Sequence, residues 1–561
     1  MTTNYQRIQR LMLPQSSNSR IEALYFRRSS GVIHDTKQGF LEIPEGEVIE
    51  FSTYFNGFFL NQWKTYTNYK GFRIKIHFTG AISWNICTEY QNREGELLPA
   101  SPEISGDWGI IEIPPEWVTR NPSICYLAAQ GEEGGGRILD IWLEGILEHP
   151  AEVVPAIVIC TYKRELFVRT NLRKLSQMDR REVPDIFLVD NGRTLEGEMF
   201  PDFVKYIKNR NTGGTGGFTR GILEVLDRLE DKPYTHVILM DDDITFDTGI
   251  LERTVQVLRG LKKLYSQGEL AGSLLQKSQP WLQYECSARW NTGKIQALHH
   301  AVDLREMDGI VENSRECEGD YGGWWYCCIP VSSIQKRGLP LPFFVHRDDI
   351  EYGIRMGRVI TMNGIGVWHD AFEEKLPQTG EYYDVRNMAI LNSIYSYPEE
   401  WGKKKWKWFL RKWVAGNILR GRYHYVNQNL MGVRDFLKGA NWLSQENGAE
   451  LHQKIGSHMK PLESFENLPE KTKKNAYMTT PAVSVYLAAL KRKIIYRDNT
   501  GGCMPSEKSV AKTLQCLYRL YKMEKQIDRY FDRAACSYQR KFEELTGNKF
   551  WRKYLEMKED E

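Results

Sequence analysis

Three consecutive aspartates, Asp241 to Asp243, follow the apolar run 237–240 and are the residues in this chain best suited to chemistry. Neighbouring carboxylates repel, so a cation or several hydrogen-bond donors must lie close to them. Side chains two positions apart on an extended segment point the same way, so Asp241 and Asp243 converge on one point. That pair suits a hard divalent cation, Mn2+ or Mg2+. The alternative is that one aspartate caps the segment that follows while the others are solvated.

A glycine-rich segment, RNTGGTGGFTRG at 210–221, immediately precedes a predicted helix. Backbone N–H groups at a helix start bind anions, and Arg220 would add a charge-assisted contact to a phosphate. The segment lacks the GKS or GKT of a Walker A loop, and no GxGxxG directly follows the first strand. A plain turn is the alternative interpretation.

A second acidic group lies in LPLPFFVHRDDIEYG at 339–353, where Asp348, Asp349 and Glu351 follow an apolar run. Adjacent carboxylates raise each other's pKa, which helps one of them act as a base near neutral pH. A solvated acidic turn is the alternative. Farther along, His369 ends the strand-like segment GIGVWH. A lone histidine is more often structural, and this one gains meaning only beside an aspartate-rich site.

The elements that must position these residues begin near residue 153. Nearly continuous apolar strands at 153–162, 185–192 and 235–243 alternate with helix-like segments at 171–177 and 218–229, which predicts an open α/β sheet. Ligands bind such sheets at the carboxyl ends of the strands. Thr161, Arg164, Asp190 and the three aspartates all lie at such ends.

The flanking regions differ in texture. Residues 1–150 show short alternating runs separated by turn clusters, typical of a β-sandwich or jelly roll. Residues 151–395 form the predicted catalytic domain, and 396–561 are predicted to be helical. In the segment 399–422, tryptophans gather on one side of a helix and lysines and arginines mainly on the other. This pattern suits an anionic membrane surface, or a helix packed on the protein with a solvated basic face.

The composition narrows the function classes. The net charge of the 561 residues is +3, which does not indicate a nucleic-acid partner. No N-terminal leader and no apolar run of about 18 residues is present, so neither secretion nor a membrane span is predicted. The ten cysteines include no CxxC pair, which argues against a structural zinc site and favours reduced thiols in a cytoplasm.

The combination of these motifs resembles a known family. A strand with TYKR, an aspartate ending the second strand, NTGGTGGFTRG, DDD, GGWW, PFFVHRDDIEYG and a late WH are similar to the nucleotide-sugar transferases of glycosyltransferase family 2. Within it, the chain resembles the galactofuranosyltransferases that build mycobacterial cell-wall galactan. The resemblance covers roughly residues 20 to 395.

The resemblance implies a GT-A (Rossmann-like) fold and inverting transfer of galactofuranose from UDP-galactofuranose to a hydroxyl of a cell-surface glycan, expected to be lipid-linked. Together with the reduced cysteines and the basic tryptophan segment, this favours a cytoplasmic enzyme, peripheral on the inner face of the membrane, and leaves a homo-oligomer open. It also assigns roles to individual residues. These are Asp349 as base with Asp348 beside it; Asp241, Asp243 and His369 as ligands of Mn2+ or Mg2+; Thr161, Arg164, Asp190, Asn211, Gly214, Arg220 and Asp242 on the donor; and Trp324, Trp325 and Glu351 on the acceptor.

Two rival interpretations stay open. The same fold would serve another donor, such as dTDP-rhamnose, because only the pocket around the sugar decides between them. A catalytically silent carbohydrate-binding protein is the rival from another class. Against it, every expected catalytic position is filled.

Overall fold

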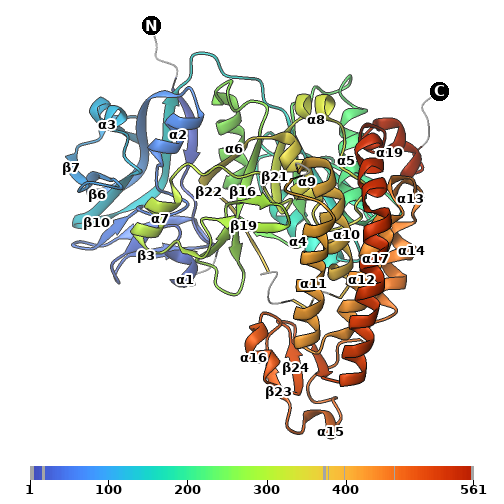
Figure 1. The fold of residues 1–561 in the computed structure, drawn as a ribbon. Coiled ribbons are helices and arrows are strands. Elements are labelled where there is room, and N and C mark those ends of the chain that lie inside the picture. Colours follow the sequence, from blue (N-terminus) through green and yellow to red (C-terminus); the bar gives the residue numbers. More distant parts are fainter. Residues whose placement is uncertain are drawn as a thin grey trace.

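The computed structural model describes residues 5–15, 19–370, 375–376, 378–396, 399–459 and 461–557. An N-terminal sheet, a central α/β part and a mainly helical C-terminal part follow one another along the chain (Figure 1). The C-terminal helices stand beside the central part, and a small lobe extends from them.

The N-terminal part is an antiparallel sheet built around two long strands, β6 (Lys70–Glu89) and β10 (Ile124–Ile146), which pair along most of their length. The other elements are β1 (Tyr5–Arg10), α1 (Ser19–Glu22), β2 (Arg27–Arg28), β3 (Ile33–Asp35), β4 (Phe40–Ile43), β5 (Val48–Glu50), α2 (Leu60–Tyr66), β7 (Glu96–Ala100), β8 (Glu103–Ser105), β9 (Trp108–Glu112) and α3 (Pro115–Arg120). A sandwich or jelly roll is not confirmed. Because most of the shorter strands pair with β6 or β10, the described strands of this part join in one 10-stranded sheet.

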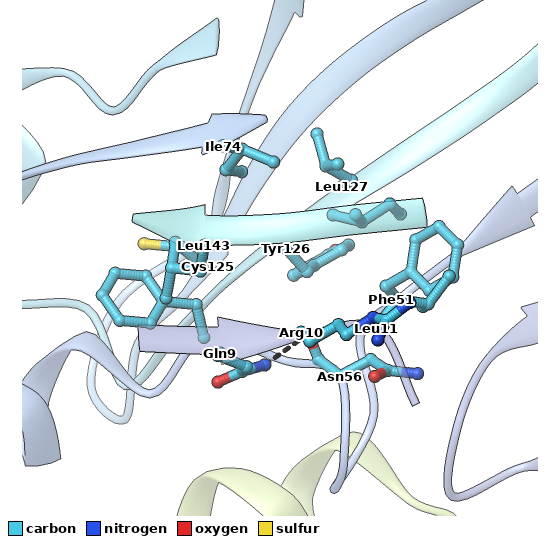
Figure 2. A pocket seen from close by; sticks show the side chains of 12 residues that line it. Gln9, Arg10, Leu11, Phe51, Asn56, Ile74, Cys125, Tyr126, Leu127 and Leu143 are labelled. Atoms are coloured by element: carbon cyan, nitrogen blue, oxygen red, sulfur yellow. Dashed lines mark hydrogen bonds between the residues drawn. The ribbon is translucent and has the colours of Figure 1, made fainter. Parts of the chain in front are cut away.

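A small pocket inside this sheet lies between β1, β6 and β10 and is lined mainly by apolar side chains, among them Ile74, Leu127 and Leu143 (Figure 2). At its edge, Gln9 donates a hydrogen bond to the carbonyl of Asn56 at 3.3 Å. None of the residues predicted to act in the site lines it, so the pocket belongs to the packing of the sheet.

The N-terminal sheet shares its core with the central part. Arg253 is 1% exposed and donates to the carbonyl of Phe55 at 2.7 Å, and the ring of Phe55 lies 5.6 Å from that of Trp368. Trp368 immediately precedes His369. The first 150 residues therefore support the strand that ends at a predicted metal ligand.

The central sheet has the strand order β13-β12-β11-β14-β21-β16-β17-β20. The elements of the central part are β11 (Pro155–Thr161), α4 (Glu165–Leu175), β12 (Asp185–Asp190), β13 (Val204–Lys208), α5 (Gly213–Leu226), β14 (His236–Asp241), β15 (Thr245–Phe246), α6 (Gly249–Gly260), β16 (Glu269–Gln276), β17 (Leu282–Glu285), β18 (Ser287–Asn291), β19 (Lys294–Leu298), β20 (Val302–Asp303), α7 (Met307–Asn313), β21 (Tyr326–Pro330), α8 (Val331–Arg337), α9 (Asp348–Met356), β22 (Val359–His369) and α10 (Gly380–Tyr395). The predicted α/β class is confirmed.

Strand order explains where a site can form. β11 pairs in parallel with β12 on one side and with β14 on the other, so successive connections leave β11 in opposite directions. Ligands bind at such switch points, outside the carboxyl ends of the strands. β15 then pairs with β22, with Thr245 opposite Trp368, which brings His369 beside the end of β14.

Two glycines of α5 have a packing reason. A Cβ on Gly217 would lie 2.2 Å from Sγ of Cys160, and one on Gly221 would lie 2.2 Å from a methyl group of Val158. The helix therefore lies directly against β11, and its N-terminus is held at the switch point.

The C-terminal part is mainly helical but includes a three-stranded sheet that the sequence pattern did not indicate. Its elements are α11 (Lys403–Leu419), α12 (Tyr423–Leu437), α13 (Ala440–Gln445), α14 (Gly448–Gly456), α15 (Glu470–Lys473), β23 (Tyr477–Thr479), α16 (Val485–Ala489), β24 (Lys493–Arg497), β25 (Cys503–Glu507), α17 (Val510–Arg540), α18 (Phe542–Leu545) and α19 (Asn548–Tyr554). Strands of three to five residues are too short to show a period of two. Of the helices described here, none is both long enough and apolar enough to cross a bilayer.

Helix α11 contains the basic, tryptophan-rich sequence, and the rest of the protein covers part of its surface. Trp406 is fully buried, while Lys403, Lys407 and Arg411 pair with acidic residues of α17 at 2.5–2.6 Å. Trp408 is 52% exposed. The packed-helix interpretation therefore accounts for part of the pattern. Lys404, Lys405 and Lys412 are exposed beside Trp408, and a membrane partner stays a prediction.

The terminal helix α19 docks on the central part through Trp551, which is fully buried and donates to the carbonyl of Pro340 at 2.8 Å. Truncation of a large buried aromatic side chain to alanine lowers protein stability by about 3–5 kcal/mol, so Trp551→Ala is expected to lower the free energy of unfolding by about that amount. Urea unfolding followed by circular dichroism measures the change. Trp408→Ala, at an exposed position, is the matched control and should stay within about 0.5 kcal/mol of the wild type.

Candidate active site

The three residues predicted as metal ligands lie together at the end of β14. One ligand atom from each of Asp241, Asp243 and His369 lies within 4.8 Å of the other two, and His369 Nε2 is 3.2 Å from Asp243 Oδ1. His369 Nδ1 lies 2.8 Å from the carbonyl of Asp370. A carbonyl can only accept, so Nδ1 carries a hydrogen and Nε2 faces the carboxylates.

The electrostatics of this cluster favour a cation. Burial, together with the charge of Asp243, raises the pKa of Asp241 to about 8. Burial would also raise the pKa of Asp243, but the hydrogen bond and charge of His369 hold it well below its ordinary value. Burial opposes charging of His369, yet Asp243 raises its pKa. Two carboxylates and an imidazole nitrogen form a donor set that fits Mn2+ or Mg2+, whose charge would relieve this repulsion.

The middle aspartate has a different task. Asp242 accepts hydrogen bonds from Thr161 at 2.7 Å and from Arg164 at 3.0 Å, and its carbonyl accepts from Asn171 at 3.0 Å. It thus ties the loop after β11 to the end of β14. Arg164 also reaches Asp243 at 2.8 Å, and its side chain is 47% exposed. Thr161 and Arg164 therefore lie where a donor contact was predicted.

The glycine-rich turn supplies an open helix start. Asn211 Oδ1 accepts from the backbone N–H of Gly213 at 3.1 Å, and a Cβ on Gly214 would meet nothing within 4 Å. Arg220 does not have the freedom expected of a phosphate ligand. Its guanidinium is held by Glu224 at 2.7 Å, one helical turn away. The predicted phosphate contact of Arg220 would require this ion pair to break.

Asp190 is a structural residue in this fold. It is fully buried, and its two oxygens accept from the N–H groups of Gly192 and Leu195, both at 2.9 Å, and from the hydroxyl of Tyr206 at 3.2 Å. Its carboxylate shapes the turn after β12. The structure offers no free oxygen edge for the nucleotide contact that was predicted.

The second acidic pair begins helix α9. Asp348 Oδ2 accepts from the hydroxyl of Thr215 at 2.5 Å, and Asp349 Oδ1 accepts from the N–H of Ile350 at 2.8 Å. Both carboxylates are partly exposed. Thr215 belongs to α5, so the glycine-rich turn and the acidic pair are fixed to one another across the switch point.

The backbone before this pair is strained. Phe344, His346 and Arg347 have φ values of 74°, 66° and 65°, in the left-handed region that costs about 1–3 kcal/mol for non-glycine residues. Asn387, fully buried on α10, holds the segment by donating to the carbonyls of Val345 at 3.0 Å and His346 at 2.7 Å. Such strain concentrates at functional sites, and here it fixes the direction of the acidic pair.

The environment of Asp349 matters for its predicted role as a base. Burial, with the neighbouring charge of Asp348, raises the pKa of Asp349 to about 7. A protonated carboxyl cannot accept a proton, so turnover that depends on Asp349 should fall as pH drops through about 7 and level off above it. The dependence of kcat/KM on pH for the wild-type chain tests this. A rate that is flat from pH 6 to 8 would contradict a role as base.

Three residues predicted to contact the acceptor are buried. Glu351 is fully buried and is paired with Arg355 at 2.7 Å and with the hydroxyl of Tyr395 at 2.6 Å, so it is not available to an acceptor. Trp324 and Trp325 are 5% and 4% exposed. The motif residues therefore pack the core beneath the site, and an acceptor contact by either indole stays a prediction.

Two further residues of the site escaped the sequence analysis. Lys277 donates from Nζ to the carbonyl of Asp243 at 2.5 Å, and its backbone N–H donates to the carbonyl of His369 at 3.1 Å. Lys277 reaches the site because the preceding residue, Gln276, pairs with His369 between β16 and β22. A pairing between strands so far apart in the sequence leaves no local pattern. Burial raises the pKa of Glu269 to about 8, and this residue accepts from the N–H of Gly322 at 2.5 Å, before the two tryptophans.

Two known proteins are similar to this chain in sequence over most of its length. The galactofuranosyltransferase GlfT2 of Mycobacterium tuberculosis is 24% identical over 401 residues, covering 63% of this chain and 60% of the relative. GlfT2 of Mycolicibacterium smegmatis is 24% identical over 442 residues, covering 69% and 65%. The chain is a homologue of these enzymes. It spans less than two thirds of their length, and no family model matches it.

Solved structures of other glycosyltransferases show a weaker likeness. The mannosyltransferase PcManGT of Pyrobaculum calidifontis, in complex with GDP-Man and Mn2+, is 11% identical with a TM-score of 0.28, covering 43% of this chain and 63% of its own. TarS residues 1–349 of S. aureus, in complex with UDP-GlcNAc, is 11% identical with a TM-score of 0.30, covering 54% and 86%. Neither likeness bears on the donor or acceptor of this chain.

Proposed function

We propose that this protein is a metal-dependent, inverting glycosyltransferase that transfers galactofuranose from UDP-galactofuranose to a hydroxyl of a glycan. One observation carries the proposal. A cluster of Asp241, Asp243 and His369 lies at the switch point of an α/β sheet. The neighbouring pair Asp348 and Asp349 is fixed to the start of helix α5, because the hydroxyl of Thr215 donates to Asp348. The homology to enzymes named galactofuranosyltransferases supports the choice of sugar.

The residues divide the work of transfer as follows. Asp241, Asp243 and His369 would hold Mn2+ or Mg2+, which when bound stabilises the charge of the departing diphosphate. Arg164 presents a half-exposed guanidinium beside this cluster, and the N-terminus of α5 has open space at Gly214. Both favour an anion.

Asp349 would take the proton from the acceptor hydroxyl as that oxygen attacks the anomeric carbon. Attack opposite the leaving diphosphate inverts the configuration. Thr215 holds Asp348, and the strained segment before α9 fixes the direction of both carboxylates. A lipid-linked acceptor, and with it a place on the cytoplasmic face of the membrane, belongs to the proposal because of the basic, tryptophan-rich sequence of α11.

Donor binding separates the proposal from its rivals. Calorimetry of the full chain with Mn2+ should show binding of UDP-galactofuranose at least about tenfold tighter than UDP-galactopyranose or dTDP-rhamnose, a difference of about 1.4 kcal/mol. Tighter binding of dTDP-rhamnose would overturn the sugar. Binding of free glycans without any nucleotide-sugar affinity would favour the silent carbohydrate-binding protein.

A further inference from the structure

Outside the acidic site, three metal-ligating side chains far apart in the sequence meet beside the central sheet. Cys286 lies between β17 and β18, His299 follows β19, and Cys317 follows α7. One ligand atom from each lies within 4.8 Å of the others, and the two sulfurs are 3.4 Å apart. No local motif announces them, because each comes from a different connection.

A series of side-chain amide hydrogen bonds fixes the tautomer of His299. The side-chain amide N–H2 of Asn363 donates to the carbonyl of Ile310 at 3.1 Å, so its oxygen meets the N–H2 of Asn313 at 2.6 Å. The oxygen of Asn313 therefore faces His299 Nδ1, at 3.0 Å. Since that oxygen can only accept, Nδ1 carries the hydrogen and Nε2 keeps the lone pair that a metal needs. Metal-bound histidines are oriented by partners of this kind.

Hydroxyl groups also lie close to the sulfur of Cys317. Hydroxyl groups of Thr361 and Ser287 lie 3.4 Å and 3.6 Å from Cys317 Sγ. Zinc binds the thiolate form of cysteine, and hydroxyl donors this close would stabilise a negative charge on Cys317 Sγ.

We propose that Cys286, His299 and Cys317 bind one Zn2+ ion, with water in the fourth position. Tetrahedral zinc with bonds of about 2.3 Å to sulfur places two thiolates about 3.8 Å apart, close to the observed separation. Binding of zinc as two thiolates releases the protons of both thiols to solvent. Thiolates and imidazole select zinc over the harder cations that suit the aspartate cluster.

The position of this ion gives it a structural consequence. After Cys317 the chain pairs with β18, where the N–H of Asp320 donates to the carbonyl of Ala288 at 2.9 Å. On the same strand, the ring of Trp290 lies under the guanidinium of Arg347 at 5.0 Å, next to the acidic pair. Zinc would therefore fasten β18 to the turn that leads to Trp324. The inference stands on its own contacts and does not depend on the proposed function.

Zinc content and cobalt spectroscopy of the full chain test the proposal. Purified wild-type protein should hold about one zinc per chain, and exchange for Co2+ should give the intense visible bands of a tetrahedral site with sulfur-to-cobalt charge transfer. An oxygen-rich six-coordinate site such as the aspartate cluster gives only weak bands. Cys286→Ser should lose the zinc and these bands, whereas Cys536→Ser, at a cysteine of α17 outside the cluster, should keep both.

Each contrary result is distinct. Wild-type protein that holds no zinc and gives no thiolate–cobalt bands would overturn the proposal, even if the cysteine variants failed to fold. Peptide mapping that finds Cys286 and Cys317 joined as a disulfide in the purified chain would overturn it as well. Zinc retained by Cys286→Ser would place the ion elsewhere.

Discussion

Replacing Asp349 with asparagine is expected to lower kcat for sugar transfer about 10²–10⁴-fold, the usual contribution of a general base. Asparagine keeps the size of the side chain and the hydrogen bond from the N–H of Ile350. It cannot accept the proton of the acceptor hydroxyl. Donor affinity should stay within about threefold of the wild type, because Asp349 is expected to act on the acceptor alone.

Single-turnover assays and donor calorimetry on the same preparation separate these two effects. Asp202→Asn, at an exposed aspartate that pairs with Arg180, is the matched control and should leave kcat unchanged. An Asp349→Asn enzyme with wild-type kcat would remove this residue from the mechanism. The residual activity should also lose the dependence on pH near 7.

Replacing Asp243 with asparagine is expected to weaken Mn2+ binding at least about 100-fold, since changes in residues that merely support a ligand already cost about 10–100-fold. Asp243 provides an oxygen close to His369 Nε2, and its other oxygen meets Arg164. The amide removes the charge that holds both. Transfer should be lost at metal concentrations that saturate the wild type.

Electron paramagnetic resonance of free Mn2+ measures this affinity directly. Asp202→Asn, at an exposed aspartate outside the cluster, is the control and should keep the Mn2+ affinity of the wild type. Equal Mn2+ affinity in wild type and Asp243→Asn would show that the cation binds elsewhere.

The sequence was informative where chemistry is local. The three aspartates at the end of an apolar strand, and the acidic pair before a helix, predicted two groups, and the structure fixes the second of them to helix α5 through Thr215. The position of the three aspartates follows from the strand end, because parallel strands deliver their carboxyl ends to a common edge.

The sequence was uninformative where register and burial decide. Lys277 joins the metal cluster only because β16 and β22 pair over a long separation, and Glu351 is removed from the site because Arg355 and Tyr395 enclose it. The basic face of α11 looked solvated until α17, more than a hundred residues later, supplied its acidic partners. No local pattern contains these pairings.

The most direct test of the account is release of UDP from UDP-galactofuranose by the purified full chain, with Mn2+ and then with EDTA. Metal-dependent transfer at this site predicts slow release that needs the metal, is faster with a glycan acceptor, and is absent in Asp243→Asn. Release that is unchanged by EDTA, or no release with any acceptor despite tight donor binding, would contradict metal-dependent transfer at this site.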